Sequence, residues 1–279
     1  MILDARPCTL GEGAFWHPER REPFWFDIAA GKLLARIRNE PAEWSFGEAV
    51  SAAGWIDRDR LLIASETGLW RFAIETGQRE RIVALEEDCS GTRSNDGRTD
   101  PAGGFWISTM GKEAEPGAGA IYRFHEGRIS RLFANLTIPN AICFAPDGRR
   151  AYFADTPRSC LMTVALDAGG WPLGEPALFA HLPGLSPDGA VTDAEGGLWS
   201  AQWGAGRVAR YRPDGRFDRA LDLPAPQVTC PCLTEGGRMI VTSAREGMSE
   251  AALMDHPLSG QTFELEAGVE GVPAPRLRL

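Results

Sequence analysis

The sequence lacks the features that direct a chain into a membrane or through one. No apolar run approaches the roughly 20 residues that a membrane-spanning helix needs. The amino terminus, Met-Ile-Leu-Asp-Ala-Arg, has neither the basic start nor the apolar core of a secretory signal. We therefore expect a cytoplasmic protein.

The chain also lacks an excess of positive charge. It carries 29 Lys and Arg residues against 38 Asp and Glu residues, for a net charge of -9. An acidic surface repels phosphate backbones and anionic lipids. We expect neither nucleic acid nor a membrane surface as a partner.

Cysteine is sparse and is not arranged as a redox or zinc motif. Only one residue separates Cys230 from Cys232, whereas those motifs place two residues between the sulfurs. A large chain without an export signal favours reduced, mostly buried thiols. The six cysteines are Cys8, Cys89, Cys143, Cys160, Cys230 and Cys232.

Several common catalytic signatures are missing as well. No Gly-x-Ser-x-Gly segment marks an esterase nucleophile, and the four histidines are scattered without metal-binding spacing. A glycine pattern at 204–209 resembles a dinucleotide fingerprint, but the residues 207–211 that follow it alternate like a strand. A nucleotide site would need a helix there, so we interpret this pattern as a hairpin turn.

What the chain has in abundance is short strands separated by glycine turns. It contains 32 Gly and 20 Pro and few helical heptads. The stretch from Leu185 to Tyr211 shows the pattern, with strand-like segments at 190–192, 198–202 and 207–211 between turns of Asp and Gly. Alternation with a period of two keeps one face dry and is typical of antiparallel strands.

One apolar strand recurs six times at an even spacing. The intervals between its central residues are 37, 44, 46, 47 and 40, close to the roughly 40–45 residues of one four-stranded propeller blade. A blade cannot bury both faces alone, so six such units predict a ring. The sequence thus predicts an all-β fold, a six-bladed β-propeller of four-stranded antiparallel blades, as a single domain over residues 1–279. The central residues are Trp25, Leu62, Trp106, Tyr152, Trp199 and Met239.

Sandwiches and barrels also combine short strands with glycine turns, but they need not keep so even a period. A ring of blades must tie its two ends together to avoid an open edge. We expect the amino-terminal strand, near Ile2 to Arg6, to pair into the last blade.

Polar residues stand at the entrances of four predicted inner strands. They are Glu12, the segment 93–97, Asn140 and Asp188. The innermost strands of a propeller begin near one mouth of its channel, so these residues should converge. Glu12, Asn140 and Asp188 would supply two carboxylates and an amide carbonyl, which suit Ca²⁺, Mg²⁺ or Mn²⁺, while Zn²⁺ and Fe²⁺ also accept oxygen ligands. Taken singly, each is also an ordinary turn residue.

Five motifs occur in order along essentially the whole chain. They are Leu10-Gly-Glu-Gly-Ala-Phe-Trp16 with Phe24-Trp-Phe-Asp-Ile28, Arg93-Ser-Asn-Asp-Gly97 with Asp100-Pro101, Ile138-Pro-Asn140, Pro187-Asp-Gly189, and Thr242-Ser-Ala-Arg-Glu-Gly-Met248. Together they closely resemble the gluconolactonase and regucalcin (senescence marker protein) family. The resemblance implies a six-bladed propeller that binds one divalent cation on its axis and hydrolyses sugar lactones.

The resemblance also implies roles for individual residues. Glu12, Asn140 and Asp188 match the family's metal ligands. Arg93 and Asn95 match its substrate-orienting pair. Glu115, four residues before Gly119 in an outer loop, falls where some members carry an acid that contacts the substrate; this match rests on loop spacing alone.

The chemistry of these residues suits lactone hydrolysis. Attack of water on the ester builds negative charge on the carbonyl oxygen, and a divalent cation stabilises that charge. Asp188 is the candidate base that takes the proton from water. Arg93 can fork two hydrogen bonds and Asn95 can both donate and accept, as a polyhydroxylated ring requires.

We therefore expect a metal-dependent lactonase that opens an aldonolactone or aldarolactone to the sugar acid, with one divalent cation (Ca²⁺, Zn²⁺, Mn²⁺, Mg²⁺ or Fe²⁺). Its partner would be a small sugar lactone, and the protein a monomer or a weak homo-oligomer. Two alternatives stay open: a non-catalytic propeller that binds a metal ion or a protein, and a related propeller esterase. A scaffold has no need for two acids, an amide and Arg-x-Asn around one axis, and an apolar mouth would favour the esterase.

Overall fold

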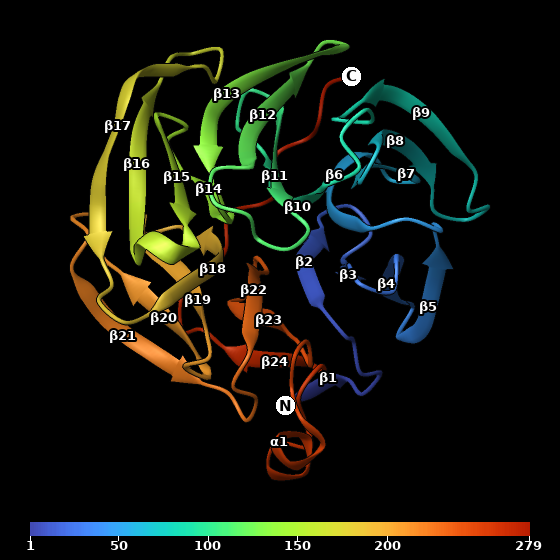
Figure 1. Ribbon diagram of the computed structural model, residues 1–279, viewed down its shortest axis with the longest axis vertical. Helices are drawn as coiled ribbons and strands as arrows, with labels where there is room; N and C mark the ends of the chain where they lie inside the picture. Colours follow the sequence, from blue (N-terminus) through green and yellow to red (C-terminus); the bar gives the residue numbers. More distant parts are fainter.

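The chain forms 24 strands, which assemble into six four-stranded antiparallel sheets. The computed structural model describes all residues, 1–279. Figure 1 shows the sheets arranged radially around a central axis, each with one strand innermost. The structure confirms the predicted six-bladed β-propeller.

Five blades are built from consecutive strands, ordered from the axis outward. The first contains β2 (Gly11–His17), β3 (Glu22–Asp27), β4 (Lys32–Ile37) and β5 (Glu40–Ser45). The second contains β6 (Val50–Asp57), β7 (Arg60–Ser65), β8 (Gly68–Ala73) and β9 (Arg79–Ala84). The third contains β10 (Thr92–Thr99), β11 (Phe105–Gly111), β12 (Gly119–His125) and β13 (Arg128–Leu136). The fourth contains β14 (Pro139–Phe144), β15 (Arg150–Asp155), β16 (Cys160–Leu166) and β17 (Pro172–His181). The fifth contains β18 (Ser186–Thr192), β19 (Leu198–Trp203), β20 (Arg207–Tyr211) and β21 (Phe217–Asp222).

The sixth blade closes the ring with both ends of the chain. It contains β22 (Val228–Leu233), β23 (Arg238–Ser243), β24 (Thr262–Glu266) and, outermost, β1 (Ile2–Asp4). Ile2 pairs with Phe263 and Asp4 with Thr262, which confirms the predicted closure. Arg6, just beyond β1, binds Asp4 and donates to a carbonyl oxygen of the first blade, that of Ala35, at 3.0 Å.

Helical structure is limited to two short segments. A 3₁₀ helix, η1 (Thr156–Arg158), follows β15, and α1 (Glu250–Asp255) lies between β23 and β24. No helix in the structure is long and apolar enough to cross a membrane.

The repeated apolar strand found in the sequence is the second strand of every blade. In the first to the sixth blade, these second strands are β3, β7, β11, β15, β19 and β23. A neighbouring blade covers each of them on both faces. Trp25, Trp106 and Trp199 are completely buried there. Large aromatic rings at equivalent positions fill the wedge between blades, which is where a propeller gains most of its apolar burial.

The cysteines are free, as predicted, and only Cys89 is exposed. Cys230 and Cys232 lie on β22 and pack against Ala14 and Ile240. Burial raises the pKa of the Cys232 thiol to about 12. These two residues therefore serve as small apolar groups of the inner strand.

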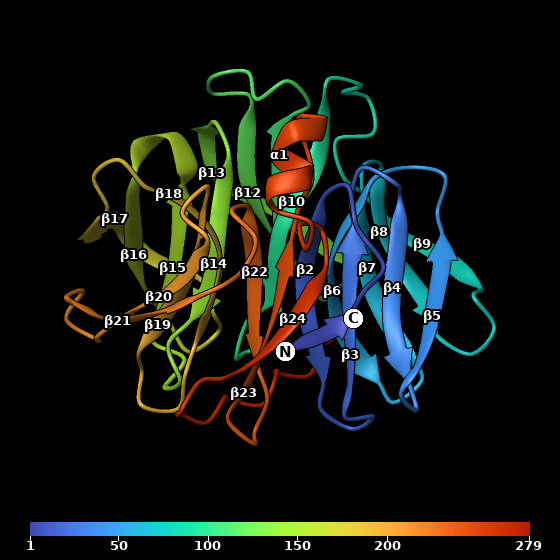
Figure 2. The same ribbon diagram turned by 90° about the horizontal axis from the view of Figure 1, so that it is seen from below.

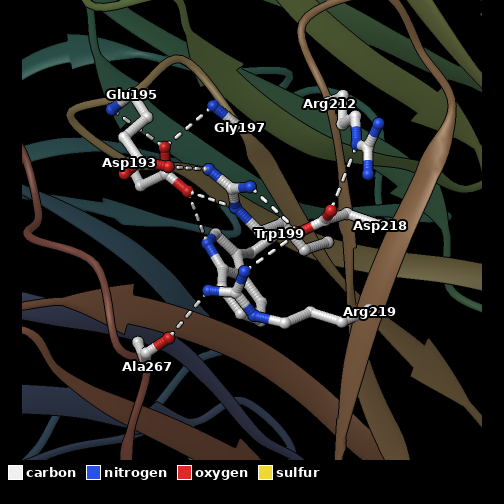
Figure 3. A network of polar contacts seen from close by, with 9 residues as sticks. Asp193, Glu195, Gly197, Trp199, Arg212, Asp218, Arg219 and Ala267 are labelled. Carbon is white, nitrogen blue, oxygen red and sulfur yellow. Dashed lines mark hydrogen bonds and ion pairs between the residues drawn. The ribbon is translucent and has the colours of Figure 1, made fainter.

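A buried carboxylate organises the turn after β18. Asp193 accepts hydrogen bonds from the backbone N–H of Gly197 at 2.8 Å, from the Trp199 indole at 2.8 Å and from the Arg210 guanidinium at 2.7 Å (Figure 3). Arg210 lies so close to Gly197 that a Cβ there would come within 2.6 Å of the guanidinium.

The third blade repeats this arrangement after β10. Asp100 accepts from the N–H of Gly104 at 3.0 Å and from Arg123 at 2.7 Å, and both charged groups are fully buried. The two sites explain the recurring Asp and Gly-Gly turns, because the carboxylate holds the turn and the missing side chain admits the arginine.

The two ends of the axis differ. We call the end where the innermost strands begin the upper mouth, and the end where they finish the lower mouth. The carboxyl-terminal segment 271–279 crosses the lower mouth: Ala274 accepts from the Trp55 indole at 2.8 Å, and the N–H of Arg278 donates to Gly103 at 2.9 Å. Figure 2 shows this segment at the opposite end of the ring from α1.

The buried pair predicts a large stability cost for Asp193→Ala. Arg210 keeps Asp218 and Glu195 as partners. The substitution nevertheless removes the acceptor of three buried donors, and each unsatisfied donor costs about 1–3 kcal/mol, so the free energy of unfolding should fall by about 3–5 kcal/mol. Asp214→Ala is the control, because Asp214 and its partner Arg216 are both largely exposed, and its effect should stay within about 0.5 kcal/mol. Urea denaturation measures both; equal losses would contradict the assignment.

Candidate functional site

The predicted polar residues lie near the beginnings of four innermost strands, at the upper mouth. Glu12 is on β2, Asn140 on β14 and Asp188 on β18, while Arg93 and Asn95 are on β10. The first, third, fourth and fifth blades therefore each contribute to one end of the axis.

Two boundaries differ from the prediction. The segment 93–97 was expected to precede an innermost strand that starts at Phe105, but it belongs to the innermost strand β10 itself, where Arg93 pairs with Met110. Asp188 was placed ahead of its strand, whereas β18 begins at Ser186. In both cases, ladder pairing extends the strand through residues whose polarity resembles that of a turn.

Each of these strands has a β-bulge at its polar residue. The register of the ladder shifts between Glu12 and Phe15 on β2 and between Asn140 and Cys143 on β14. The residues directly after the two polar ones, Gly13 and Ala141, both have a φ of 58°. A bulge bends the strand and redirects a side chain, so it can turn a polar group in an otherwise apolar strand toward the axis.

Two aspartates at the ends of second strands anchor the chain as it enters these bulges. Asp27, the last residue of β3, accepts from the N–H of Thr9 at 2.8 Å and of Leu10 at 3.1 Å. Asp155, the last residue of β15, accepts from Thr137 at 3.0 Å and from the residue after it at 2.9 Å. The same device therefore fixes the segments that precede Glu12 and Asn140.

Three carboxyl groups meet at the upper end of the axis. Glu12, Asp96 and Asp188 are all buried. Burial, followed by the charge of Asp96, raises the pKa of Glu12 to about 8. Burial, followed by the charge of Glu12, raises the pKa of Asp188 well above its usual range, and the two carboxyl groups hydrogen-bond to each other. The carboxyl groups therefore repel one another when ionised, and a cation between them would relieve that repulsion.

A chain of hydrogen bonds runs from Arg93 to the fifth blade. Arg93 donates to Asn95 Oδ1 at 2.9 Å, and Asn95 Nδ2 donates to Asn140 Oδ1 at 2.9 Å. Asn140 Nδ2 then donates to the hydroxyl of Thr156 at 3.0 Å, which donates to the carbonyl of Pro187 at 2.7 Å. The chain joins both predicted substrate-orienting residues to Asn140 and ends beside Asp188.

A half-buried guanidinium lies below the three acids. The Arg98 guanidinium donates to the backbone oxygens of Ile142 at 3.1 Å and Ala190 at 2.9 Å. Its side chain thus reaches from β10 to both β14 and β18. Its charge partly offsets that of Asp96, which accepts from the N–H of Ile142 at 2.6 Å.

The donor set suits a hard divalent cation. Two carboxylates and an amide oxygen are the ligand types that Ca²⁺, Mg²⁺ and Mn²⁺ prefer. The structure contains no group of three or more His, Cys, Asp or Glu side chains placed to hold a metal ion. A site at the upper mouth would therefore depend on the amide of Asn140 as well as on carboxylates.

Charged side chains surround the upper mouth. A cavity of about 440 Å³ beside it is lined by Glu66, Arg93, Lys112 and Glu246 on the charged side, and by apolar residues such as Ile28. Burial lowers the pKa of Arg93, and the charges of Glu246, Glu12 and other acids counteract this effect. This side of the mouth therefore combines charged groups with apolar ones.

Glu115 makes no hydrogen bond to the polar residues of the upper mouth. It is exposed in the loop between β11 and β12, where its carboxylate accepts from the backbone N–H of Glu113 at 3.1 Å. Its predicted contact with a substrate stays a prediction.

The family model described as SMP-30/Gluconolactonase/LRE-like region matches residues 10–245. The chain belongs to this family. It is 37% identical over 286 residues to L-arabinolactonase of Azospirillum brasilense, covering 99% of this chain and 94% of that protein. It is 32% identical over 282 residues to 6-deoxy-6-sulfogluconolactonase of Pseudomonas putida, covering 97% and 95%.

A solved structure shares the whole architecture of this gluconolactonase-family chain. The calcium-binding protein regucalcin from Agrobacterium tumefaciens superposes with a TM-score of 0.97 at 40% sequence identity, covering 100% of this chain and 97% of that one. The fold and the family inferred from the five motifs are thereby confirmed.

Three residues of this family member's site were given no role from the sequence, although Asp96 lies in the segment 93–97 that was expected to converge there. Asp96 and Arg98 stand in or next to a segment that resembles a glycine turn, and Thr156 lies outside all five motifs. The alternation on β10 could have indicated Asp96 and Arg98, because residues two apart share a face of a strand. No local pattern marks Thr156, whose partners lie on β14 and β18.

The bulge at Asn140 predicts an unusual response to glycine. An L-residue in the left-handed conformation costs roughly 1–2 kcal/mol, so Ala141→Gly should be close to neutral or slightly stabilising. Ala154→Gly, at an equally buried alanine of the same blade without positive φ, should lower the free energy of unfolding by about 1 kcal/mol or more. Urea denaturation of the metal-free protein compares them, and equal losses would show that Ala141 is unstrained.

Proposed function

We propose that the protein is a divalent-metal-dependent lactonase that opens an aldonolactone to its sugar acid. The observation that supports this most is the convergence of Glu12, Asp188 and the Arg93–Asn95–Asn140 hydrogen-bond chain at one mouth of the axis. The relatives named as lactonases support the hydrolysis of a lactone ester.

Glu12, Asn140 and Asp188 would hold the cation. Their oxygens are hard donors, and the mutual repulsion of the two carboxylates is a local cost that a divalent charge offsets. The relative of known structure is described as calcium-binding, which favours Ca²⁺ among the ions that such a site accepts. A cation held there would supply electrostatic stabilisation of the carbonyl oxygen as the ester is attacked.

Asp188 is the proposed general base. Its carboxyl group is buried at the upper mouth, and a cation held there would keep it ionised, so that it can accept a proton from water. Glu12 lies within hydrogen-bonding reach of Asp188, so the two carboxyl groups that would hold the cation lie side by side.

Arg93 and Asn95 are the proposed orienting residues. Arg93 uses one guanidinium nitrogen on Asn95 and on the backbone oxygen of Ser94, which leaves other N–H groups for a ligand. The acids and the lysine around the mouth favour a polyhydroxylated substrate over an apolar ester. This environment separates the proposal from the esterase alternative.

The proposal predicts lactone hydrolysis that depends on added cation. Chelated protein should hydrolyse pentono- or hexonolactones only after Ca²⁺, Zn²⁺, Mn²⁺, Mg²⁺ or Fe²⁺ is restored, as followed with a pH indicator after subtraction of spontaneous opening.

Asp188→Asn should lower kcat by about 100-fold or more, whereas Asp147→Asn, in an exposed turn, should leave it unchanged. Cation-independent rates, or near-normal turnover of Asp188→Asn with cation bound, would refute the assigned roles. Absence of hydrolysis with every ion would favour a non-catalytic binding propeller.

The raised pKa values predict that cation binding strengthens with pH. In the metal-free protein Glu12, with a pKa of about 8, is mostly protonated at pH 6, so a cation must displace a proton there. Affinity should rise between pH 6 and pH 8 as Glu12 loses its proton. Titration calorimetry in buffers of different ionisation enthalpy should show proton release at pH 6.5, and binding without proton release would contradict the prediction.

The same groups predict the pH dependence of metal-free stability. Glu12 binds its proton more tightly in the folded state than in the unfolded chain, where its pKa is 4.5. The resulting stabilisation is present below about pH 4.5 and is lost as pH rises through about 8. This contribution should be reduced or absent in Glu12→Gln, which urea denaturation between pH 6 and pH 9 measures. An unchanged pH profile in that variant would contradict the shift.

A further inference from the structure

Thr156 joins two blades at the point where the candidate ligands converge. It is the first residue of η1, directly after β15. Its hydroxyl contacts the Asn140 side chain of the fourth blade at 3.0 Å and the Pro187 carbonyl of the fifth blade at 2.7 Å. Pro187 is the residue before Asp188. One hydroxyl therefore contacts the side chain of one candidate ligand and the backbone next to the other.

The Pro187 carbonyl determines the direction of these hydrogen bonds. A carbonyl oxygen can only accept, so the single hydroxyl hydrogen of Thr156 must point toward it. The Thr156 oxygen then offers only a lone pair to Asn140. Asn140 must therefore present its NH₂ group to Thr156, which leaves its carbonyl oxygen on the opposite side, facing Asn95.

Arg93 determines the direction at the other end. A guanidinium can only donate, so Asn95 must present its oxygen to Arg93 and its NH₂ group to the Pro139 carbonyl and to Asn140 Oδ1. The two ends agree on the orientation of the Asn140 amide. Asn140 Oδ1 uses one lone pair on Asn95, and the other remains for a cation.

We infer that Thr156 is a positioning residue that locks the Asn140 amide with its oxygen available to a cation, and that holds Asn140 in register with the backbone beside Asp188. The inference rests on the proposed cation site. A flipped amide would present N–H groups to the cation and repel it, so loss of the hydroxyl should weaken cation binding without removing any ligand.

The main test compares substitutions of Thr156 by calorimetric titration with Ca²⁺. Thr156→Val keeps the shape but can neither donate nor accept, and it should bind Ca²⁺ about 10-fold to 100-fold more weakly, as for other partners of metal ligands. Thr156→Ser keeps the hydroxyl and should stay within about threefold of the parent protein. Thr163→Val is the matched control, since the Thr163 hydroxyl in the same blade donates only to the Ala151 carbonyl.

A double-mutant cycle separates orientation of the amide from general support of the fold. Asn140→Asp replaces the amide by a carboxylate, which has no NH₂ end to misplace. If Thr156 acts through the amide, Thr156→Val should cost at most about threefold in Ca²⁺ affinity when combined with Asn140→Asp. A full 10-fold loss in that background would overturn the inference in favour of a purely structural role.

A third measurement needs no cation. In the metal-free protein, solvent exchange of the Asn140 side-chain amide protons, followed by NMR, should become faster in Thr156→Val and remain slow in Thr156→Ser. Unchanged exchange and unchanged Ca²⁺ affinity in Thr156→Val would overturn the inference while leaving the lactonase proposal intact. Failure of the parent protein to bind any divalent cation would instead refute the proposed function and, with it, the ligand role of Asn140.

Discussion

Closure of the ring is the constraint on which the site depends. The pairing of β1 with β24 places both ends of the chain in the sixth blade, and Arg6 extends this link to the first. Only a closed ring keeps the starts of six innermost strands around one axis. Residues as distant in sequence as Glu12 and Asp188 can then share a hydrogen bond. Neither β2 nor β18 alone defines the site, because each of these strands supplies only one of the two carboxyl groups.

The two halves of the axis use buried charge differently. Toward the lower mouth, Asp100 and Asp193 each have an arginine partner and several N–H donors, so their charges are well compensated. At the upper mouth, Glu12 and Asp188 face each other, and burial raises the pKa of both. Uncompensated charge is costly in a protein interior and is usually retained where a ligand will be bound. The contrast therefore separates the stabilising part of the molecule from its candidate site.

The sequence predicted the ring well because its evidence is repetitive. Second strands centred on residues such as Trp25 and Trp199 recur with an even period, and each repeat must be buried in the same way. The polar entrances could also be found, since Glu12, Asn140 and Asp188 interrupt apolar strands. These signals are local, and six repeats reinforce one another.

The remaining features depend on contacts between blades, which no local pattern records. Ala141 has a left-handed backbone conformation, and the position could not be recognised in the sequence because it is not a glycine. Arg98 contacts backbone oxygens of two other blades, and Thr156 acts through a carbonyl of the neighbouring blade. Backbone acceptors have the same chemistry in every sequence, so partnerships of this kind become visible only once the strands are placed.

The position of Arg98 has a consequence for the distribution of charge along the axis. Its side chain reaches from β10 to β14 and β18 and lines a cavity of about 140 Å³, together with residues such as Phe144 and Val272 but none of the candidate ligands. The axis is therefore divided electrostatically. Carboxyl groups lie toward the upper mouth, and a guanidinium lies beneath them, over a cavity that the candidate ligands do not line.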